Sequence, residues 1–144
     1  MVLRARSRLV LVVFGFLFVA ATLSCRGPGA KPQSMTRLGD DAIVAGSSAY
    51  IRDSILGDLI VASGDVDFLS ATGGDYLGAG GKQRIAGQIH GSLRAAGGSI
   101  EVRAVVDRNA TIAGGTITVD STAVIAQNAY ITGGSVQVDG TVRG

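Results

Sequence analysis

Small residues and branched aliphatic residues form a pattern that repeats every 17 residues along most of the chain. Pairs of glycine or serine that follow alanine or threonine begin at positions 46, 63, 80, 97, 114 and 133, so four steps are 17 residues long and the last is 19. Aligned on these pairs, the apolar residues fall into columns, which predict a ladder of core side chains. The ladder consists of Ile51, Phe68, Ile85, Val102, Val119, Val138, Ile55, Ile89 and Val106. Repetition at a fixed period is typical of solenoid proteins.

The spacing inside each unit predicts strands. Apolar positions follow one another at steps of two, four, four and two residues, and a step of two places side chains on one face of a strand. Corner residues such as Gly57-Asp58 and Gly74-Asp75 separate the apolar positions, because glycine and aspartate suit tight turns. We therefore expect an all-β, single-stranded β-helix (a β-solenoid) over 39–144, with about six turns. Each turn should contain about three short strands, and the two extra residues of the fifth unit should lie within 122–127.

The last turn is expected to be truncated. A single unit has no core of its own and buries its apolar residues only by stacking on a neighbour. Stacked turns are about 4.8 Å apart, so six turns form a rod on the order of 25–30 Å long. The sequence stops at Gly144 after the beginning of a turn. An incomplete turn leaves an unpaired strand edge, to which another copy can add. The candidate residues for this polymer end are Val136, Val138 and Val142.

The N-terminal segment resembles a bacterial export signal. Three arginines within residues 1–8 precede an apolar run from Leu9 to Leu23, and Ser24-Cys25 follows. A basic start, an apolar run and a small residue describe a secretory signal over 1–24. The run is shorter than the roughly 20 residues that span a bilayer, so a permanent anchor is the weaker alternative. The flank 25–38 is polar, holds both prolines and is expected to be a flexible tether.

Cys25 is the candidate lipidation site. In the bacterial lipoprotein signals that this segment resembles, the cysteine after the apolar run is lipidated and becomes the new N-terminus. Thr22 stands where those signals usually have leucine, so ordinary cleavage nearby, with a free thiol, stays open as an alternative. Arg26 follows the cysteine in place of an aspartate, which favours the outer membrane over the inner one. The chain has 1 cysteine, so it forms no intrachain disulfide.

The charge balance argues against nucleic acid as a partner. The chain contains 13 basic and 11 acidic residues. Three of the basic residues, Arg4, Arg6 and Arg8, lie in the leader, so the remainder carries 10 basic against 11 acidic side chains. A nucleic-acid-binding face needs a basic excess in the folded part, and none is present.

The residues with potential chemistry do not form a convincing catalytic or metal site. His90 is the single histidine and is expected at an exposed corner. Asp65 and Asp67 share an outer face, but a Ca²⁺ site needs six to eight oxygen ligands. The Gly-Ala-Gly-Gly-Lys-Gln stretch of 78–83 lacks the glycine and hydroxyl spacing of a phosphate-binding loop. The sequence therefore predicts a protein that is not an enzyme and needs no cofactor or metal.

The repeat resembles the bactofilins, a family of polymer-forming bacterial cytoskeletal proteins. The resemblance covers roughly 40–144 and rests on the stretches 57–62, 73–81, 91–102 and 110–119, for example Ala-Thr-Ile-Ala-Gly-Gly-Thr-Ile-Thr-Val in the last of them. It implies a right-handed β-helix that joins end to end into filaments without a nucleotide. The usual members are cytoplasmic, whereas this chain carries an export signal.

Three functions remain open at this stage. The first is a structural β-helix protein that self-associates at the cell envelope, held to the outer membrane by an N-terminal lipid, with itself, the membrane and cell-wall components as partners. The second is a monomeric, surface-anchored stalk that displays a binding face. The third is an enzyme of the left-handed β-helix acyltransferase type, which this chain matches poorly because those enzymes repeat every six residues.

Overall fold

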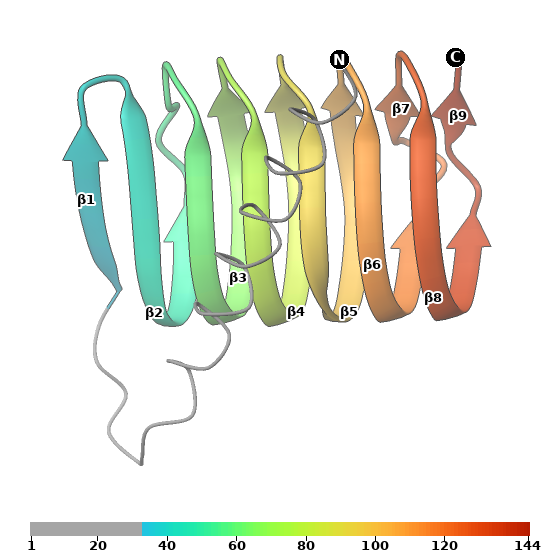
Figure 1. The fold of residues 1–144 in the computed structure, drawn as a ribbon, viewed down its shortest axis with the longest axis horizontal. Helices are drawn as coiled ribbons and strands as arrows, with labels where there is room; N and C mark the ends of the chain where they lie inside the picture. The colour runs from blue at the N-terminus through green and yellow to red at the C-terminus, as the bar shows by residue number, and fades with distance from the viewer. Residues whose placement is uncertain (1–32) are drawn as a thin grey trace, which may run out of the picture.

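The computed structural model describes residues 33–144, and this part of the chain is an all-β solenoid (Figure 1). The strands are β1 (Ser34–Leu38), β2 (Asp41–Ile51), β3 (Leu59–Thr72), β4 (Tyr76–Ile89), β5 (Leu93–Val106), β6 (Ala110–Val119), β7 (Val124–Ile125), β8 (Ala129–Val138) and β9 (Thr141–Val142). From β2 onward, each strand pairs in parallel with its equivalent in the next coil. The register of 17 residues, as in Phe68 beside Ile85, confirms the predicted repeat and fold class.

The coil is right-handed. In Figure 1 each turn descends on the near side, bends at the bottom and returns on the far side while the chain advances toward the C-terminus. This is the sense that the resemblance to bactofilins implied. Among residues 33–144, no helix is long and apolar enough to cross a membrane.

Each central coil contains one long bent strand, which corrects the prediction of three short strands. β3, β4 and β5 are each 14 residues long, and the glycine pair lies inside the strand. At Gly80 an added Cβ would collide with the carbonyl oxygen of Ser63 in the preceding coil. Two backbones approach closely at this bend because glycine has no side chain, so the ladder continues around the corner without a break.

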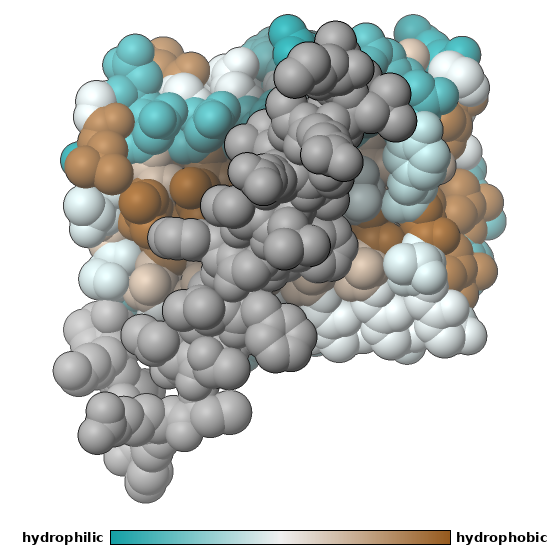
Figure 2. All heavy atoms as spheres, viewed as in Figure 1, coloured by the Kyte–Doolittle hydropathy of each residue, from teal (hydrophilic) through white to brown (hydrophobic). Residues whose placement is uncertain are grey.

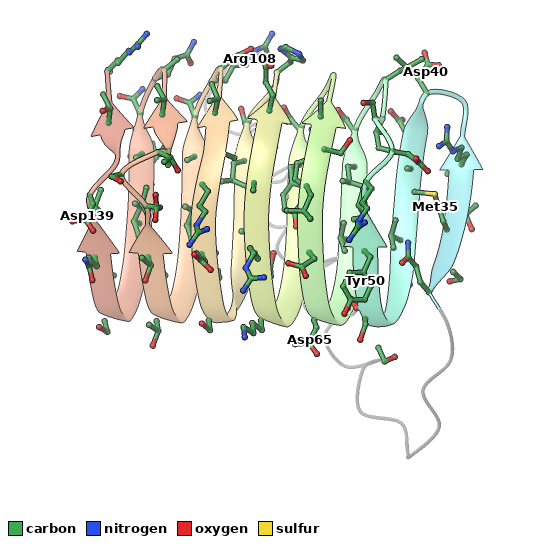
Figure 3. All side chains as sticks on the ribbon, turned by 180° about the vertical axis from the view of Figure 1, so that it is seen from behind. Met35, Asp40, Tyr50, Asp65, Arg108 and Asp139 are labelled. Atoms are coloured by element: carbon green, nitrogen blue, oxygen red, sulfur yellow. The ribbon has the colours of Figure 1, made fainter. Side chains whose placement is uncertain are left out.

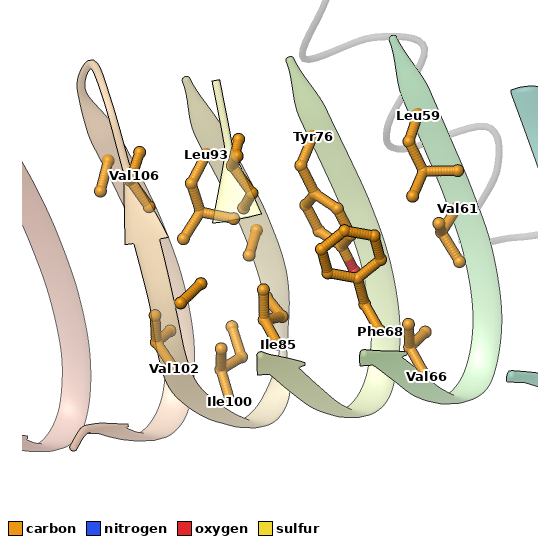
Figure 4. Close-up of a cluster of buried hydrophobic side chains, with 14 of the residues drawn as sticks. Leu59, Val61, Val66, Phe68, Tyr76, Ile85, Leu93, Ile100, Val102 and Val106 are labelled. Carbon is orange, nitrogen blue, oxygen red and sulfur yellow. The ribbon is translucent and has the colours of Figure 1, made fainter. Parts of the chain in front are cut away.

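The interior consists of the predicted ladders. Phe68, Ile85 and Val102 are fully buried, and Ile51 and Val119 are 1% exposed. Ile55, Ile89 and Val106 are buried in the second ladder, which continues through Ile125 in the fifth unit. Figure 4 shows Phe68, Ile85, Val102 and Val106 in the narrow space between the two sides of the coil. Val138 is the exception: it lies in the last coil of the described residues and is 45% exposed.

The bulge of the fifth unit lies slightly earlier than predicted. Val119 pairs with Val102 in the 17-residue register, whereas Val124 pairs with Val105, which is 19 residues away. The two extra residues therefore lie within 120–123. Asp120 closes this turn, because its carboxylate accepts hydrogen bonds from both the backbone nitrogen and the hydroxyl of Thr122, each at 3.0 Å.

Candidate assembly interface

The C-terminal end of the solenoid is an open strand edge. β8 pairs on one side with β6, and β9 pairs with β7, so their outer edges have no partner strand within the described residues. Val136 is 44% exposed, although Ile117, its equivalent in the preceding coil, is fully buried. Val142 is 39% exposed, although its neighbour Ile125 is fully buried. Positions that are buried in earlier coils are thus exposed in the last coil that the structure describes.

The N-terminal end is covered by a strand that the sequence did not reveal. β1 pairs antiparallel with the first half of β2, from Ser34 opposite Ala45 to Leu38 opposite Asp41. Residues 34–38 therefore belong to the folded part, and the expectation of a flexible tether through residue 38 is wrong for this segment. Met35 packs against the core, as the labelled side chain in Figure 3 indicates. No residue in β1 matches the repeat, so periodicity could not have detected the strand.

The side chain of Gln33 covers part of the remaining N-terminal edge. Its Oε1 accepts a hydrogen bond of 3.0 Å from the backbone nitrogen of Tyr50, and its Nε2 donates one of 3.5 Å to the Tyr50 carbonyl oxygen. The amide thus bonds to Tyr50 as a neighbouring strand would. The two ends of the solenoid differ: β1 and Gln33 cover the first coil, whereas nothing in the described part of the chain covers the last.

A ladder of side-chain hydrogen bonds runs along one corner of the rod. The Oδ1 atom of Asp41 accepts a bond from the nitrogen of Asp58, that of Asp58 accepts one from Asp75, and that of Asp75 accepts one from Ser92, at 2.8, 2.7 and 2.7 Å. Stacked aspartates repel one another. The backbone donors and Arg94, whose Nη1 lies 2.7 Å from Asp75 Oδ2, offset that repulsion. Asp41 is therefore part of a structural ladder as well as a charge at the N-terminal edge.

The residues weighed for chemistry fall in separate places: His90 lies beside Asp107, whereas Asp65, Asp67 and Lys82 line one depression. His90 is exposed at a corner, as expected, with its Nδ1 atom 2.8 Å from Asp107 Oδ2. Within residues 33–144 no group of three or more His, Cys, Asp or Glu side chains is placed to hold a metal ion. Gly80 and Gly81 belong to β4, and Gln83 is buried in the core. Cys25 lies outside the described residues.

A depression of about 240 Å³ lies beside Tyr50 and Asp65, which Figure 3 labels. Its lining includes Tyr50, Asp65, Asp67, Lys82 and Arg84. Arg84 lies 3.6 Å from Asp67 and 3.4 Å from Glu101, so its charge is balanced by neighbouring coils. These pairs are exposed, and such pairs contribute little to stability. The arrangement describes a solvated charged face.

Comparison of the chain with protein-family models, with curated proteins and with solved structures found no match. The fold and the asymmetry of its two ends therefore carry the functional inference. They define a β-solenoid whose first and last described coils differ in how they are covered.

Proposed function

We propose that this chain is a self-associating, bactofilin-like β-helix protein of the bacterial cell envelope, with no catalytic role. The observation that supports the proposal is the open C-terminal edge, where Val136, Val138 and Val142 are between 39% and 45% exposed. Unpaired backbone groups beside apolar side chains form a template for another strand. No charged or proline residue interrupts the edge strand from Ala129 to Val138.

Two copies related by a two-fold axis would pair β8 with β8 in antiparallel orientation, because the axis reverses the direction of the strand in the second copy. A contact of this isologous kind closes at a dimer. A filament needs a second contact, for which the outer edge of β1 is the available strand at the other end. The size of the assembly therefore reports whether one end or both ends associate.

The test compares lysine substitutions at the open end with matched substitutions elsewhere. Val136→Lys with Val138→Lys places two charges on the edge and should abolish assembly. The control is Leu69→Lys with Val105→Lys, at outward positions that are 47% and 38% exposed but lie in central coils. Light scattering and negative-stain microscopy of the full chain report assembly, and circular dichroism reports folding. Filaments of the natural chain that persist in the end variant would contradict the proposal, and dimers alone would restrict it to the C-terminal contact.

The envelope location has its own test. We propose that residues 1–24 direct export and that Cys25 carries the lipid that anchors the chain to the outer membrane. Incorporation of radioactive palmitate should be present in the natural chain and absent in Cys25→Ala. Label retained by the variant would contradict lipidation at Cys25 and leave the assembly test unaffected.

A monomeric stalk is the second candidate, and the covered N-terminal end favours it. A rod capped by β1 at one end could remain single if the exposed valines do not associate. Discrete particles of the natural chain at high concentration would support this alternative.

A further inference from the structure

One outer face of the solenoid carries a row of apolar side chains at its N-terminal half. The column follows the strand register from Ile43 through Ile60 to Leu77, and it continues through Arg94 and Thr111 to Tyr130. Two residues further along each strand, a second outward row is formed almost wholly by alanine: Ala45, Ala62, Ala79, Ala96, Ala113 and Thr132. Figure 2 shows hydrophobic residues on the visible part of this face, between hydrophilic residues at the upper corner and residues of intermediate hydropathy at the lower bend.

The exposure of these side chains follows from the alternation of each strand. Ile43 is 37% exposed between Ala42 and Val44, which are 1% and 0% exposed, and Ile60 is 40% exposed. Leu38 at the end of β1 is 59% exposed, but it lies opposite Asp41 at the acidic corner and outside this row. The core is therefore fully occupied by the inward residues, and the outward aliphatic residues form an additional apolar surface.

The size of this surface does not suit a stable dimer. Even if all six strands are counted, a spacing of about 4.8 Å and an apolar width of about 10 Å give an upper limit on the order of 250 Å² for the patch. Stable protein interfaces bury about 800 Å² on each partner. A lateral contact between two copies through this face would therefore be weak.

The polar residues around the patch favour a lipid surface. Arg94 and Tyr130 continue the same column, and the amphipathic side chains of Arg and Tyr suit the interface between lipid and water. Asp41, Asp58 and Asp75 follow the upper corner beside the patch. This acidic row repels an anionic surface, so the pattern favours neutral, zwitterionic phospholipid.

The short distance along the chain from Cys25 to the start of β1 agrees with a phospholipid surface as the partner of this face. Gln33 is 8 residues after Cys25, and each residue spans at most about 3.5 Å, so a lipid on Cys25 would hold the start of β1 within about 28 Å of the membrane. One lipid signal and one weak apolar surface act together, as they do in proteins with two anchoring elements. We propose that the apolar face formed by Ile43, Ile60 and Leu77, with the alanine row beside them, lies on the phospholipid surface. This inference rests on the proposed lipidation of Cys25 and is independent of the proposed end-to-end assembly.

The test uses the processed chain, purified from membranes and reconstituted into phosphatidylcholine vesicles. Ile60→Cys places a thiol in the apolar face, and Leu69→Cys, which is the matched control, places one at an outward position with 47% exposure on the far side of the same strand. Each thiol carries an environment-sensitive fluorophore, and nitroxide-labelled phospholipid is the quencher. The label at position 60 should be quenched at least threefold more strongly than the label at position 69.

Each outcome bears on the proposal separately from lipidation. Equal quenching at the two positions overturns it, and so does a signal at position 60 that depends on protein density but not on the nitroxide, because that signal indicates a second copy. Replacing part of the phosphatidylcholine with phosphatidylglycerol should not increase quenching. If palmitate labelling shows that Cys25 has no lipid, the same comparison is made with added Cys25→Ser chains and excess vesicles. Stronger quenching at position 60 then supports binding of the apolar face to phospholipid without a lipid on Cys25. Equal quenching at the two positions overturns the proposal.

Discussion

The hydroxyl of Tyr76 donates a hydrogen bond to Oε1 of Gln83 at 3.4 Å inside the solenoid. Both side chains are fully buried or nearly so, and the Nε2 atom of Gln83 donates to the carbonyl oxygen of Ala96 at 2.7 Å. Gly78 makes room for the pair, because an added Cβ would collide with the ring of Tyr76 and the amide of Gln83. One coil of an aliphatic ladder thus contains a satisfied polar pair.

The next coil provides the design for replacing this pair. Leu93, Ala95 and Ile100 occupy the positions of Tyr76, Gly78 and Gln83. The triple variant Tyr76→Leu, Gly78→Ala, Gln83→Ile should be at least as stable as the natural chain, because an apolar set replaces both partners of a hydrogen bond. Gln83→Ile alone should lower the free energy of unfolding by about 1–3 kcal/mol, since the Tyr76 hydroxyl then has no acceptor. Urea unfolding measures both, and a single variant as stable as the triple would contradict the account.

Tyr76 should also make the fold sensitive to alkali. Burial raises the pKa of its hydroxyl well above the ordinary value of 10.0. The folded state therefore retains a proton that the unfolded state releases. The stability that the protonated Tyr76 hydroxyl contributes is complete below pH 10 and is lost as the pH rises further. The free energy of unfolding should fall by about 1.4 kcal/mol per pH unit above pH 10. Tyr76→Phe should remove this slope, and an unchanged slope in that variant would assign it to other groups.

Asp120 should contribute stability at neutral pH that disappears in acid. The backbone hydrogen bond from Thr122 is the largest of the interactions that lower the pKa of this carboxyl below 3.8, followed by the bond from the Thr122 hydroxyl. A carboxyl whose pKa is lower in the folded state stabilises the fold at a pH above its unfolded-state pKa. This stabilisation is lost as the pH falls through the folded-state pKa. Asp120→Ala should thus unfold at a lower temperature than the natural chain at pH 7, and the difference should shrink as the pH falls below 3.8. A difference that grows in acid would be opposite in sign to this expectation.

Gly87 in β4 should tolerate substitution less well than the other glycines at the bends of the coil. Its φ is +117°, and a Cβ there would collide with the carbonyl oxygen of Ser70 in the preceding coil. Gly87→Ala should lower the free energy of unfolding by about 2 kcal/mol or more, because both the backbone angle and the space exclude a side chain. Gly134→Ala is the control, since its Cβ would lie 3.2 Å from the nearest atom and its φ is not positive. Chemical denaturation of the two variants measures the difference, and equal costs would rule out the role given to the φ of Gly87.

The sequence by itself determined the repeat, the fold class and the core columns. A period of 17 residues survives because every coil must present equivalent side chains to its neighbours, as Phe68 and Ile85 do. It also placed Val136 and Val138 in columns that are buried in earlier coils.

Only the tertiary structure decided the features that depend on a single coil or on the two ends. β1 has no counterpart in the repeat, and its place is set by antiparallel pairing to an edge that exists only once. The continuous bent strands depend on the close approach of glycine backbones such as that of Gly80 to the coil before it. The partnership of Tyr76 with Gln83 and the apolar outer face over Ile43 and Ile60 arise because stacking places residues 7 and 17 positions apart side by side. Periodicity specifies what all coils share, whereas contacts between coils specify how each one differs.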